Sequence, residues 1–206
     1  MARPKYSDDM VINRMEAILA AAMELLEAEG INGISLRKTA KLMGWSSTAI
    51  YRYFENKQDL ITALRARAFR RMEQRLKKAV KPNASGIENL KRISQAFLKA
   101  GQDRPELYEL MFYEHKNEES SSYYEELSNA KNDSLSVCTD MVASAQQKGE
   151  LPPNIDPLTT SHIFWINMHG LVSLDISNQL VMGRKANVLT DILIQNILGG
   201  LSHAQS

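Results

Sequence analysis

The chain has 206 residues, of which 44% are apolar and 24% charged, and its formal net charge is +1. This length allows one sizeable hydrophobic core or two modest ones. No stretch approaches the roughly 20 apolar residues of a membrane span, and the start MARPKYSDD lacks the apolar core of a secretory signal. The single cysteine, Cys138, cannot form an internal disulfide and is too few for a zinc site. We therefore expect a cytoplasmic protein that does not bind membranes.

Charge is divided unequally between the two parts of the chain. Residues 1–81 contain 16 Lys and Arg against 9 Asp and Glu, whereas residues 82–206 contain 9 against 15. A basic N-terminal part would neutralise phosphates, and an acidic remainder would stay off a nucleic acid. Chance clustering of solvated charges explains the same numbers.

A first amphipathic helix is predicted over residues 8–29, and Gly30 ends it. Ahead of it, Arg3, Lys5 and Tyr6 form a short basic arm that is either a DNA contact or a disordered terminus. The apolar stripe of the helix consists of Ile12, Met15, Ile18, Leu19, Ala22, Leu25 and Leu26.

Two short helical patterns meet at a break within residues 35–60. Leu36, Ala40 and Met43 have the spacing of one buried helix face, and Gly44 is suited to a left-handed helix end. After the turn Gly44-Trp45-Ser46, the hydroxyl of Ser46 is expected to cap a second helix. The buried side of this second helix would be Ala49, Ile50 and Phe54. Two helices joined by such a turn form a helix-turn-helix, whose second helix fits the major groove of DNA.

The outer face of the second helix carries polar, phenolic and cationic side chains and no acidic one. Thr48 and Arg52 could reach base edges, and Tyr51, Tyr53 and Lys57 could hold phosphates. Two ordinary surface helices remain the alternative. The predicted DNA-binding residues are Ser35, Arg37, Ser46, Ser47, Thr48, Ala49, Tyr51, Arg52, Tyr53 and Lys57.

These residues also resemble a known family. Gly44-Trp45-Ser46, Ile50-Tyr51, Tyr53-Phe54, Lys57 and Leu60, which follow Arg14, Ile18-Leu19, Ala22, Leu25 and Gly30, are similar to the DNA-binding domain of the tetracycline-repressor (TetR) family of bacterial transcriptional regulators. Thr39, Trp45, Thr48 and Tyr53 depart from the usual family residues, which affects the expected operator more than the fold. The resemblance implies a repressor, since repression is the usual behaviour of the family.

A long helix should follow from Asn56, which with Asp59 has the layout of a capping box, to about Val80. Its expected inner residues are Leu60, Leu64, Ala68, Met72 and Leu76, and its expected solvated cations are Arg65, Arg67, Arg70, Arg71, Arg75, Lys77 and Lys78. The family resemblance implies that this helix transmits a conformational change between two domains. Four further helix starts are expected at Ser85, Asp103, Ser122 and Asp156.

The last two predicted helices, residues 158–182 and 188–201, are apolar on more than one face. A second subunit would cover the additional face in a two-fold four-helix interface, although a central helix in a monomer could explain the first of them. The predicted dimer-interface residues are Ile166, Leu174, Leu189, Leu193 and Ile197.

The segment Trp165-Ile-Asn-Met-His169-Gly170 resembles the tryptophan–histidine–glycine signature of one class of regulatory domain in this family. It implies a C-terminal domain that binds a small effector. An effector cavity would have apolar walls with a few polar groups, although each candidate could equally be core. The candidates are Phe97, Tyr108, Met111, Phe112, Cys138, Met141, Trp165 and His169.

No motif indicates an enzyme, a metal site or a cofactor. His115, His162, His169 and His203 lack the spacing of a helical zinc pair, and neither Gly-x-Ser-x-Gly nor a glycine-rich phosphate loop occurs. We therefore predict an all-α protein with a DNA-binding domain (1–56), a connecting helix (57–82) and an effector-binding and dimerisation domain (83–206). It would bind double-stranded DNA as a homodimer at an inverted repeat and respond to a small molecule. An architectural DNA-binding protein without a ligand is the main alternative, and a helical enzyme is a weaker one.

Overall fold

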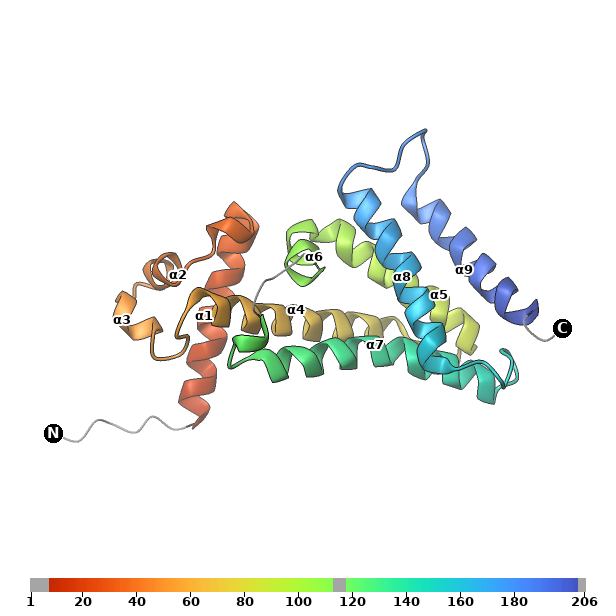
Figure 1. The fold of residues 1–206 in the computed structure, drawn as a ribbon, viewed down its shortest axis with the longest axis horizontal. Helices are drawn as coiled ribbons and strands as arrows, with labels where there is room; N and C mark the ends of the chain where they lie inside the picture. Colours follow the sequence, from red (N-terminus) through yellow and green to blue (C-terminus); the bar gives the residue numbers. More distant parts are fainter. Residues whose placement is uncertain (1–7, 113–117, 204–206) are drawn as a thin grey trace. The chain divides into compact units, whose positions relative to one another are not determined.

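The computed structural model describes residues 8–112 and 118–203, and within these ranges every regular element is helical (Figure 1). The predicted all-α class is confirmed. The basic arm of Arg3, Lys5 and Tyr6 lies outside the described residues, as does His115. No helix in the described part of the chain is long and apolar enough to cross a membrane.

The elements follow one another with short connections. In chain order they are α1 (Asp8–Glu29), η1 (Ile31–Gly33), α2 (Leu36–Leu42), α3 (Ser47–Ile50), α4 (Lys57–Ala79), α5 (Gly86–Asp103), α6 (Pro105–Phe112), η2 (Glu118–Ser120), α7 (Tyr124–Gln147), α8 (Pro157–Ile176) and α9 (Ala186–His203). The helices predicted over 8–29 and from 57 to about 80 are found with nearly these bounds.

The chain forms two compact units. The first contains residues 1–68 and 109–128, and the second contains residues 69–108 and 129–206. The described residues 109–112 and 118–128 therefore group with the N-terminal helices, although they lie far from them in sequence. The predicted domain boundaries at 56 and 82 separate parts of the chain by their expected function, whereas the two compact units are defined by packing. These boundaries therefore stay a prediction.

The first unit is built as the helix-turn-helix pattern predicts. Ile50 and Phe54 are fully buried, and Leu36 and Ala40 are nearly so. Gly44 has a φ of 68°, the left-handed conformation that glycine adopts without strain, and it begins the turn between α2 and α3. The turn is therefore encoded locally, by one residue that can reverse the chain.

Three predicted helix starts are observed. Ser85 accepts the N–H of Glu88, Asp156 accepts the N–H of Thr159, and the side chain of Asn56 accepts the N–H of Asp59. Each bond satisfies one of the N–H groups that a helix start leaves without an intrahelical partner.

Three other predicted caps are wrong. Ser46 precedes α3, but its side chain makes no capping hydrogen bond. At the start of α7 it is Ser121, not Ser122, whose hydroxyl accepts an N–H, from Tyr123 at 3.2 Å. Asp103 is the last residue of α5 and pairs with cations instead. Helices α6 and α7 still begin within two residues of Asp103 and Ser122, but ion pairs of Asp103 and the hydroxyl of Ser121 replace the predicted caps.

In the second unit α5, α8 and α9 pack against one another. Gly101 permits a close approach of α5 to α8, since a Cβ there would lie 2.3 Å from Cγ1 of Val172. The predicted helix 158–182 extends too far, because α8 ends at Ile176 and Asn178 has a φ of 56°. Asparagine tolerates this left-handed conformation better than most residues, and no glycine or proline signals the break.

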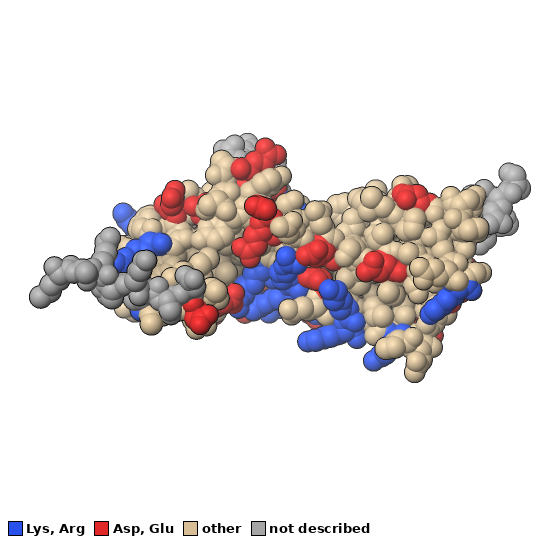
Figure 2. Space-filling model, turned by 90° about the horizontal axis from the view of Figure 1, so that it is seen from below, with Lys and Arg blue, Asp and Glu red and all other residues tan. Residues whose placement is uncertain are grey.

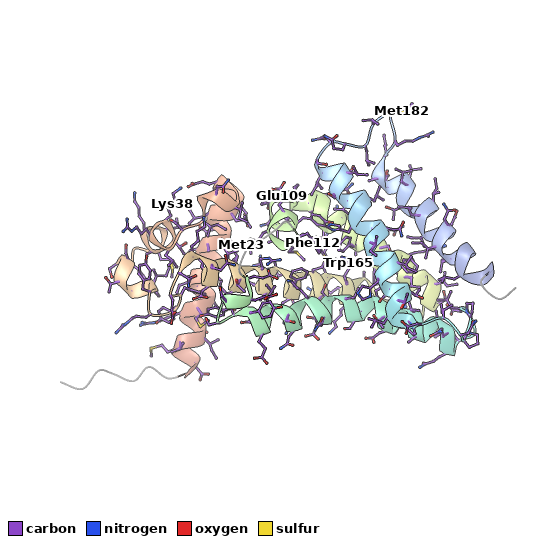
Figure 3. The ribbon with its side chains drawn as sticks, viewed as in Figure 1. Met23, Lys38, Glu109, Phe112, Trp165 and Met182 are labelled. Carbon is purple, nitrogen blue, oxygen red and sulfur yellow. The ribbon has the colours of Figure 1, made fainter. Side chains whose placement is uncertain are left out.

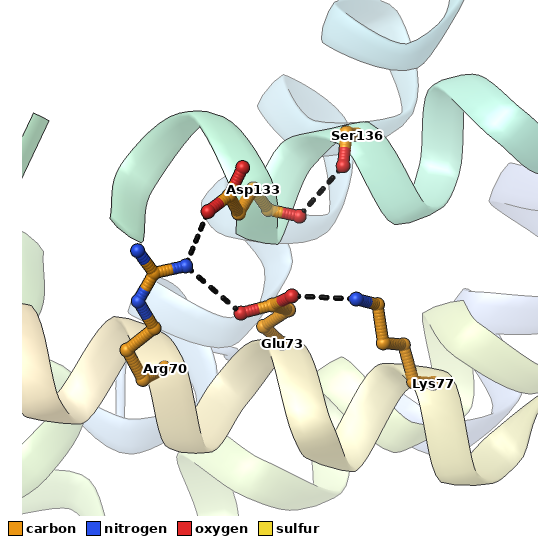
Figure 4. A network of polar contacts seen from close by, with 5 residues as sticks. All are labelled: Arg70, Glu73, Lys77, Asp133 and Ser136. Atoms are coloured by element: carbon orange, nitrogen blue, oxygen red, sulfur yellow. Dashed lines mark hydrogen bonds and ion pairs between the residues drawn. The ribbon is translucent and has the colours of Figure 1, made fainter. Parts of the chain in front are cut away.

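Helix α4 buries its predicted inner face, but the prediction that its cations are merely solvated is wrong. Arg65 is only 5% exposed. Arg70 pairs with Asp133 of α7 and with Glu73, which also accepts from Lys77 at 2.6 Å (Figure 4). Two further ion pairs of α4 are Arg67 with Glu16 and Arg75 with Asp103.

These pairs alter the expected role of the basic residues. On the face drawn in Figure 2, patches of Lys and Arg lie directly beside Asp and Glu. The ion pair of Arg70 with Asp133 also raises the pKa of Arg70, mainly through its hydrogen bond to that carboxylate. The cations of α4 therefore join it to its neighbouring helices and do not form one uninterrupted basic surface.

Candidate nucleic-acid interface and effector site

The predicted reading face is exposed. Ser46, Ser47, Thr48 and Arg52 are all exposed, and Tyr51 is 49% exposed. The regular part of α3 is only four residues long. The chain continues in a helical turn, because the N–H groups of Tyr53 and Phe54 both donate to the carbonyl of Ile50, at 2.9 and 3.2 Å. Small polar groups therefore lie at the start of this element, and larger donors lie at its end.

The remaining candidates lie around this element. Arg37 on α2 and Lys57 at the start of α4 are exposed, and Ala49 is half-buried. Ser35 has a structural role, because its hydroxyl accepts the N–H of Lys38 at 3.2 Å and so caps α2. The side chain of Lys38, labelled in Figure 3, pairs with Glu29 of α1.

A cluster that the sequence reasoning missed lies beside α3. Arg14 of α1 donates to the hydroxyl of Tyr53 at 3.4 Å, and its guanidinium carbon lies 5.9 Å from the ring centre of Trp45. The rings of Trp45 and Tyr53 are 6.2 Å apart. A guanidinium held against aromatic rings places a positive charge beside the predicted reading face. The cationic and aromatic residues at family positions were the available signal, but their spacing in the chain does not show that they meet.

In the second unit the structure brings together four of the effector candidates. Tyr108 and His169 lie with a hydroxyl oxygen to Nδ1 distance of 2.6 Å and stacked rings at 5.6 Å. Phe97 meets Tyr108 edge-on at 5.9 Å, and Trp165 lies 6.0 Å from His169. His162, which was not among the candidates, extends this row by an edge contact with Trp165 at 6.2 Å.

The polar pair at the centre of this aromatic cluster has a defined chemistry. Burial lowers the pKa of His169, so the neutral ring is favoured. If the hydroxyl of Tyr108 donates to Nδ1, the proton of the neutral ring lies on Nε2, which is then a donor. An apolar wall with one such donor group is typical of sites that orient a mostly apolar ligand.

The other effector candidates are on α6 and α7. Cys138 and Met141 are on α7, and burial raises the pKa of the Cys138 thiol to about 12. Met111 and Phe112 end α6 and belong to the first compact unit. Among the described residues no three His, Cys, Asp or Glu side chains gather as metal ligands would.

Helices α8 and α9 expose apolar side chains. Ile166 is 61% exposed and Leu174 is 47% exposed, whereas Leu189, Leu193 and Ile197 are half-buried. Trp165 on α8 and Met182, in the connection between α8 and α9, are labelled in Figure 3. Further exposed apolar residues that the prediction omitted are Ile163, Val188 and Ile192.

Comparison with protein families agrees with this geometry. A model described as "Bacterial regulatory proteins, tetR family" matches residues 18–64, which contain the helix-turn-helix. A second, described as "Tetracyclin repressor-like, C-terminal domain", matches residues 90–197, more than half of the chain. The chain belongs to the TetR family. It is a DNA-binding transcriptional regulator, and its predicted family resemblance is confirmed.

Solved structures of other proteins share the fold. A protein of unknown function from Rhodococcus sp. RHA1 has a TM-score of 0.79 and 24% identity, with 92% of this chain and 95% of that chain covered. The fatty acid degradation regulator FadR from Bacillus halodurans has a TM-score of 0.71 and 18% identity, over 97% and 100%. FadR from Bacillus subtilis in complex with stearoyl-CoA has a TM-score of 0.73 and 19% identity, over 90% and 98%. No curated protein matches the sequence significantly.

Proposed function

We propose that this TetR-family protein is a repressor that binds an inverted-repeat operator as a homodimer and is released by a small, largely apolar effector. The exposed, acid-free face of α3 is the observation that carries the DNA-binding half of this proposal. Two copies would present their recognition elements about one helical turn apart, ~34–36 Å or somewhat more, to successive major grooves. Residues 1–56 would read DNA, 57–82 would connect, and 83–206 would bind the effector and the second subunit.

The exposed apolar residues of α8 and α9 support the homodimer. Ile166, Leu174, Val188 and Ile192 would otherwise leave large apolar side chains in water. A two-fold four-helix interface between copies would cover Ile166 and Leu174 on α8 together with Leu189, Leu193 and Ile197 on α9. Sedimentation of the purified protein tests this assignment, and the substitutions Ile166→Glu and Leu193→Glu should favour the monomer.

The aromatic cluster of Phe97, Tyr108, Trp165 and His169 supports the effector-binding half. Its apolar rings would contact a ligand, and the pair of Tyr108 and His169 would orient a carbonyl or carboxylate group. The FadR structure with stearoyl-CoA, a relative in fold, supports a ligand of this mostly apolar kind. An effector would lower DNA affinity only by its preference for the dimer form in which the two recognition elements do not match the operator.

The DNA-binding half is tested by selecting retained sequences from a library of random duplexes at moderate salt. A repressor of this kind would enrich an inverted repeat. Weak, salt-sensitive retention of all sequences would instead indicate architectural binding.

Two substitutions then test the assigned residues. Arg52→Ala should cost ~1–3 kcal/mol of operator binding and relax specificity, if Arg52 contacts a base. Lys57→Ala should weaken all sequences alike and make the salt dependence shallower by about one phosphate contact. Equal effects of both variants on operator and random DNA would reject the role given to Arg52.

The effector half is tested with fatty acids and acyl-CoA thioesters of increasing chain length, added to the operator complex. Fluorescence anisotropy of labelled operator DNA should show release by the longer chains. The response should weaken in Tyr108→Phe and Trp165→Ala, while Tyr124→Phe, at the first residue of α7 and outside the candidate effector residues, should respond as the wild type does. A series that leaves operator affinity unchanged would remove this ligand class.

A further inference from the structure

The segment from Glu118 to Tyr124, here termed the clamp segment, directly contacts the predicted DNA-binding domain, residues 8–56, here termed the reader. It consists of η2 and the residues that lead into α7, and it belongs to the same compact unit as the helix-turn-helix. The family resemblance alone had assigned the transmission between domains to α4. The contacts of the clamp segment lie within the first compact unit, and no local sequence pattern indicated them.

The first contact holds the end of the recognition element. The hydroxyl of Tyr123 donates to the backbone carbonyl of Tyr53 at 2.6 Å, between residues 70 apart in the chain. Tyr53 lies beyond the last residue of α3, so its carbonyl is outside the hydrogen-bond ladder of that helix. The rings of Tyr123 and Phe54 also meet, with centres 5.1 Å apart.

The surroundings of Tyr123 favour the protonated hydroxyl that this bond requires. Burial raises the pKa of Tyr123 to about 12, so the hydroxyl keeps its proton and remains a donor at ordinary pH. Phe54 is fully buried, and it anchors the ring of Tyr123 to the core of the reader. The donor is therefore positioned by packing as well as by its own hydrogen bond.

The second contact holds the start of α4. The hydroxyl of Ser121 donates to Oδ1 of Asp59 at 2.7 Å, while the side chain of Asn56 donates to Oδ2 at 3.3 Å. Asp59 is 3% exposed and Ser121 is 8% exposed, so water cannot readily replace the Ser121 hydroxyl. Lys57, the candidate phosphate contact, lies between Asn56 and Asp59 and begins the same helix.

The clamp segment is itself anchored. Arg65 of α4 pairs with Glu118, and the same guanidinium donates to the carbonyls of Leu110 and Met111 at 3.1 and 3.0 Å. Helix α6 also contains Tyr108, the residue that bonds His169, less than one turn before Leu110. The same short helix therefore carries a member of the candidate effector site and two carbonyls held by Arg65.

From these contacts we propose that Tyr123 and Ser121 are positioning residues of the DNA reader. They fix the end of the recognition element and the start of α4 from the segment that follows α6. Each of these bonds favours the arrangement of the reader that matches an operator.

The proposal rests on the proposed function, because it requires an operator to measure. The variants Tyr123→Phe and Ser121→Ala each remove one hydroxyl and keep the rest of the side chain. Their matched controls are Tyr124→Phe and Ser122→Ala, since in the described chain the hydroxyls of Tyr124 and Ser122 make no side-chain hydrogen bond.

Operator and random duplexes are titrated with each variant over a range of salt, well below the unfolding midpoint of every protein. Tyr123→Phe removes one hydrogen bond, and Ser121→Ala removes two, the bond to Asp59 and the bond from the Tyr123 N–H. Each variant should weaken operator binding by at least about three- to tenfold, the effect of one hydrogen bond of ordinary net strength. Binding to random DNA and the slope against salt should not change, because no phosphate contact is removed. The two controls should bind as the wild type does.

A purely structural role predicts a different result. It would lower the unfolding midpoint and leave the ratio of operator to random affinity unchanged, and that outcome would overturn the proposal. Equal losses on both duplexes would also overturn it. If the wild type enriches no inverted repeat, the proposed operator recognition fails, and this is seen before any variant is compared.

Discussion

Replacing Arg65 by methionine should strongly destabilise the protein. Arg65 is 5% exposed, pairs with Glu118 and donates two further hydrogen bonds to the carbonyls of Leu110 and Met111. Burial lowers its pKa to about 10, so it remains charged at neutral pH. Methionine fills similar space but leaves the carboxylate and both carbonyls without this partner.

The expected magnitude follows from the burial. Removing one partner of a buried ion pair costs ~3–5 kcal/mol. Here the loss comes from the carbonyls of Leu110 and Met111 as well as from the carboxylate of Glu118, whose side chain is 21% exposed. For a chain of this size, the unfolding midpoint should fall by about 6–20 °C. Circular dichroism at several protein concentrations measures this loss and separates it from a shift in dimerisation.

The control is Arg75→Met on the same helix. Arg75 pairs with Asp103, but both side chains are more than a third exposed, and exposed pairs contribute little to stability. The double variant Arg65→Met with Glu118→Gln should recover part of the loss, since it removes the carboxylate charge as well. Midpoints that are equal for Arg65→Met and Arg75→Met would refute the structural role given to the buried guanidinium.

Three further predictions concern the second compact unit. Gly101→Ala should destabilise by up to ~2 kcal/mol in urea denaturation, because its Cβ overlaps Val172, whereas Gly170→Ala, which meets nothing within 4 Å, should stabilise by up to ~1 kcal/mol. Because burial lowers the pKa of His169, its contribution to stability should be complete above pH 6.5 and be lost as the pH falls through the lowered value; pH-dependent unfolding that His169→Gln leaves unchanged would contradict this. Burial raises the pKa of the Cys138 thiol to about 12, so iodoacetamide at neutral pH should label Cys138 slowly in the folded protein and rapidly after unfolding. Rapid labelling of the folded protein would refute this raised pKa.

Much of the fold was predictable from local sequence. The spacing of apolar residues identified the inner face of α4, and Gly44 identified the turn. Asn56, Ser85 and Asp156 marked helix starts, because each bonds an N–H only three residues away. Such features depend on near neighbours in the chain, and these are known before any tertiary contact forms.

The candidate DNA-binding face was predictable for the same reason. The burial of Ile50 and Phe54 leaves Thr48 and Arg52 on the outer side of a short helical element. The family resemblance predicted the function, and the spacing of apolar residues predicted which side of the second helix is exposed. Neither indicated that Arg14 of α1 would lie beside Tyr53.

Only the tertiary structure decided which distant groups meet. Helical spacing places Arg65 on the predicted solvent-exposed face of α4, yet the end of α6 and Glu118 cover its side chain. Tyr108 meets His169 across 61 residues, and Tyr123 meets Tyr53 across 70. Helical periodicity specifies which face of each helix is apolar, but the neighbour that covers this face depends on how all the helices pack together.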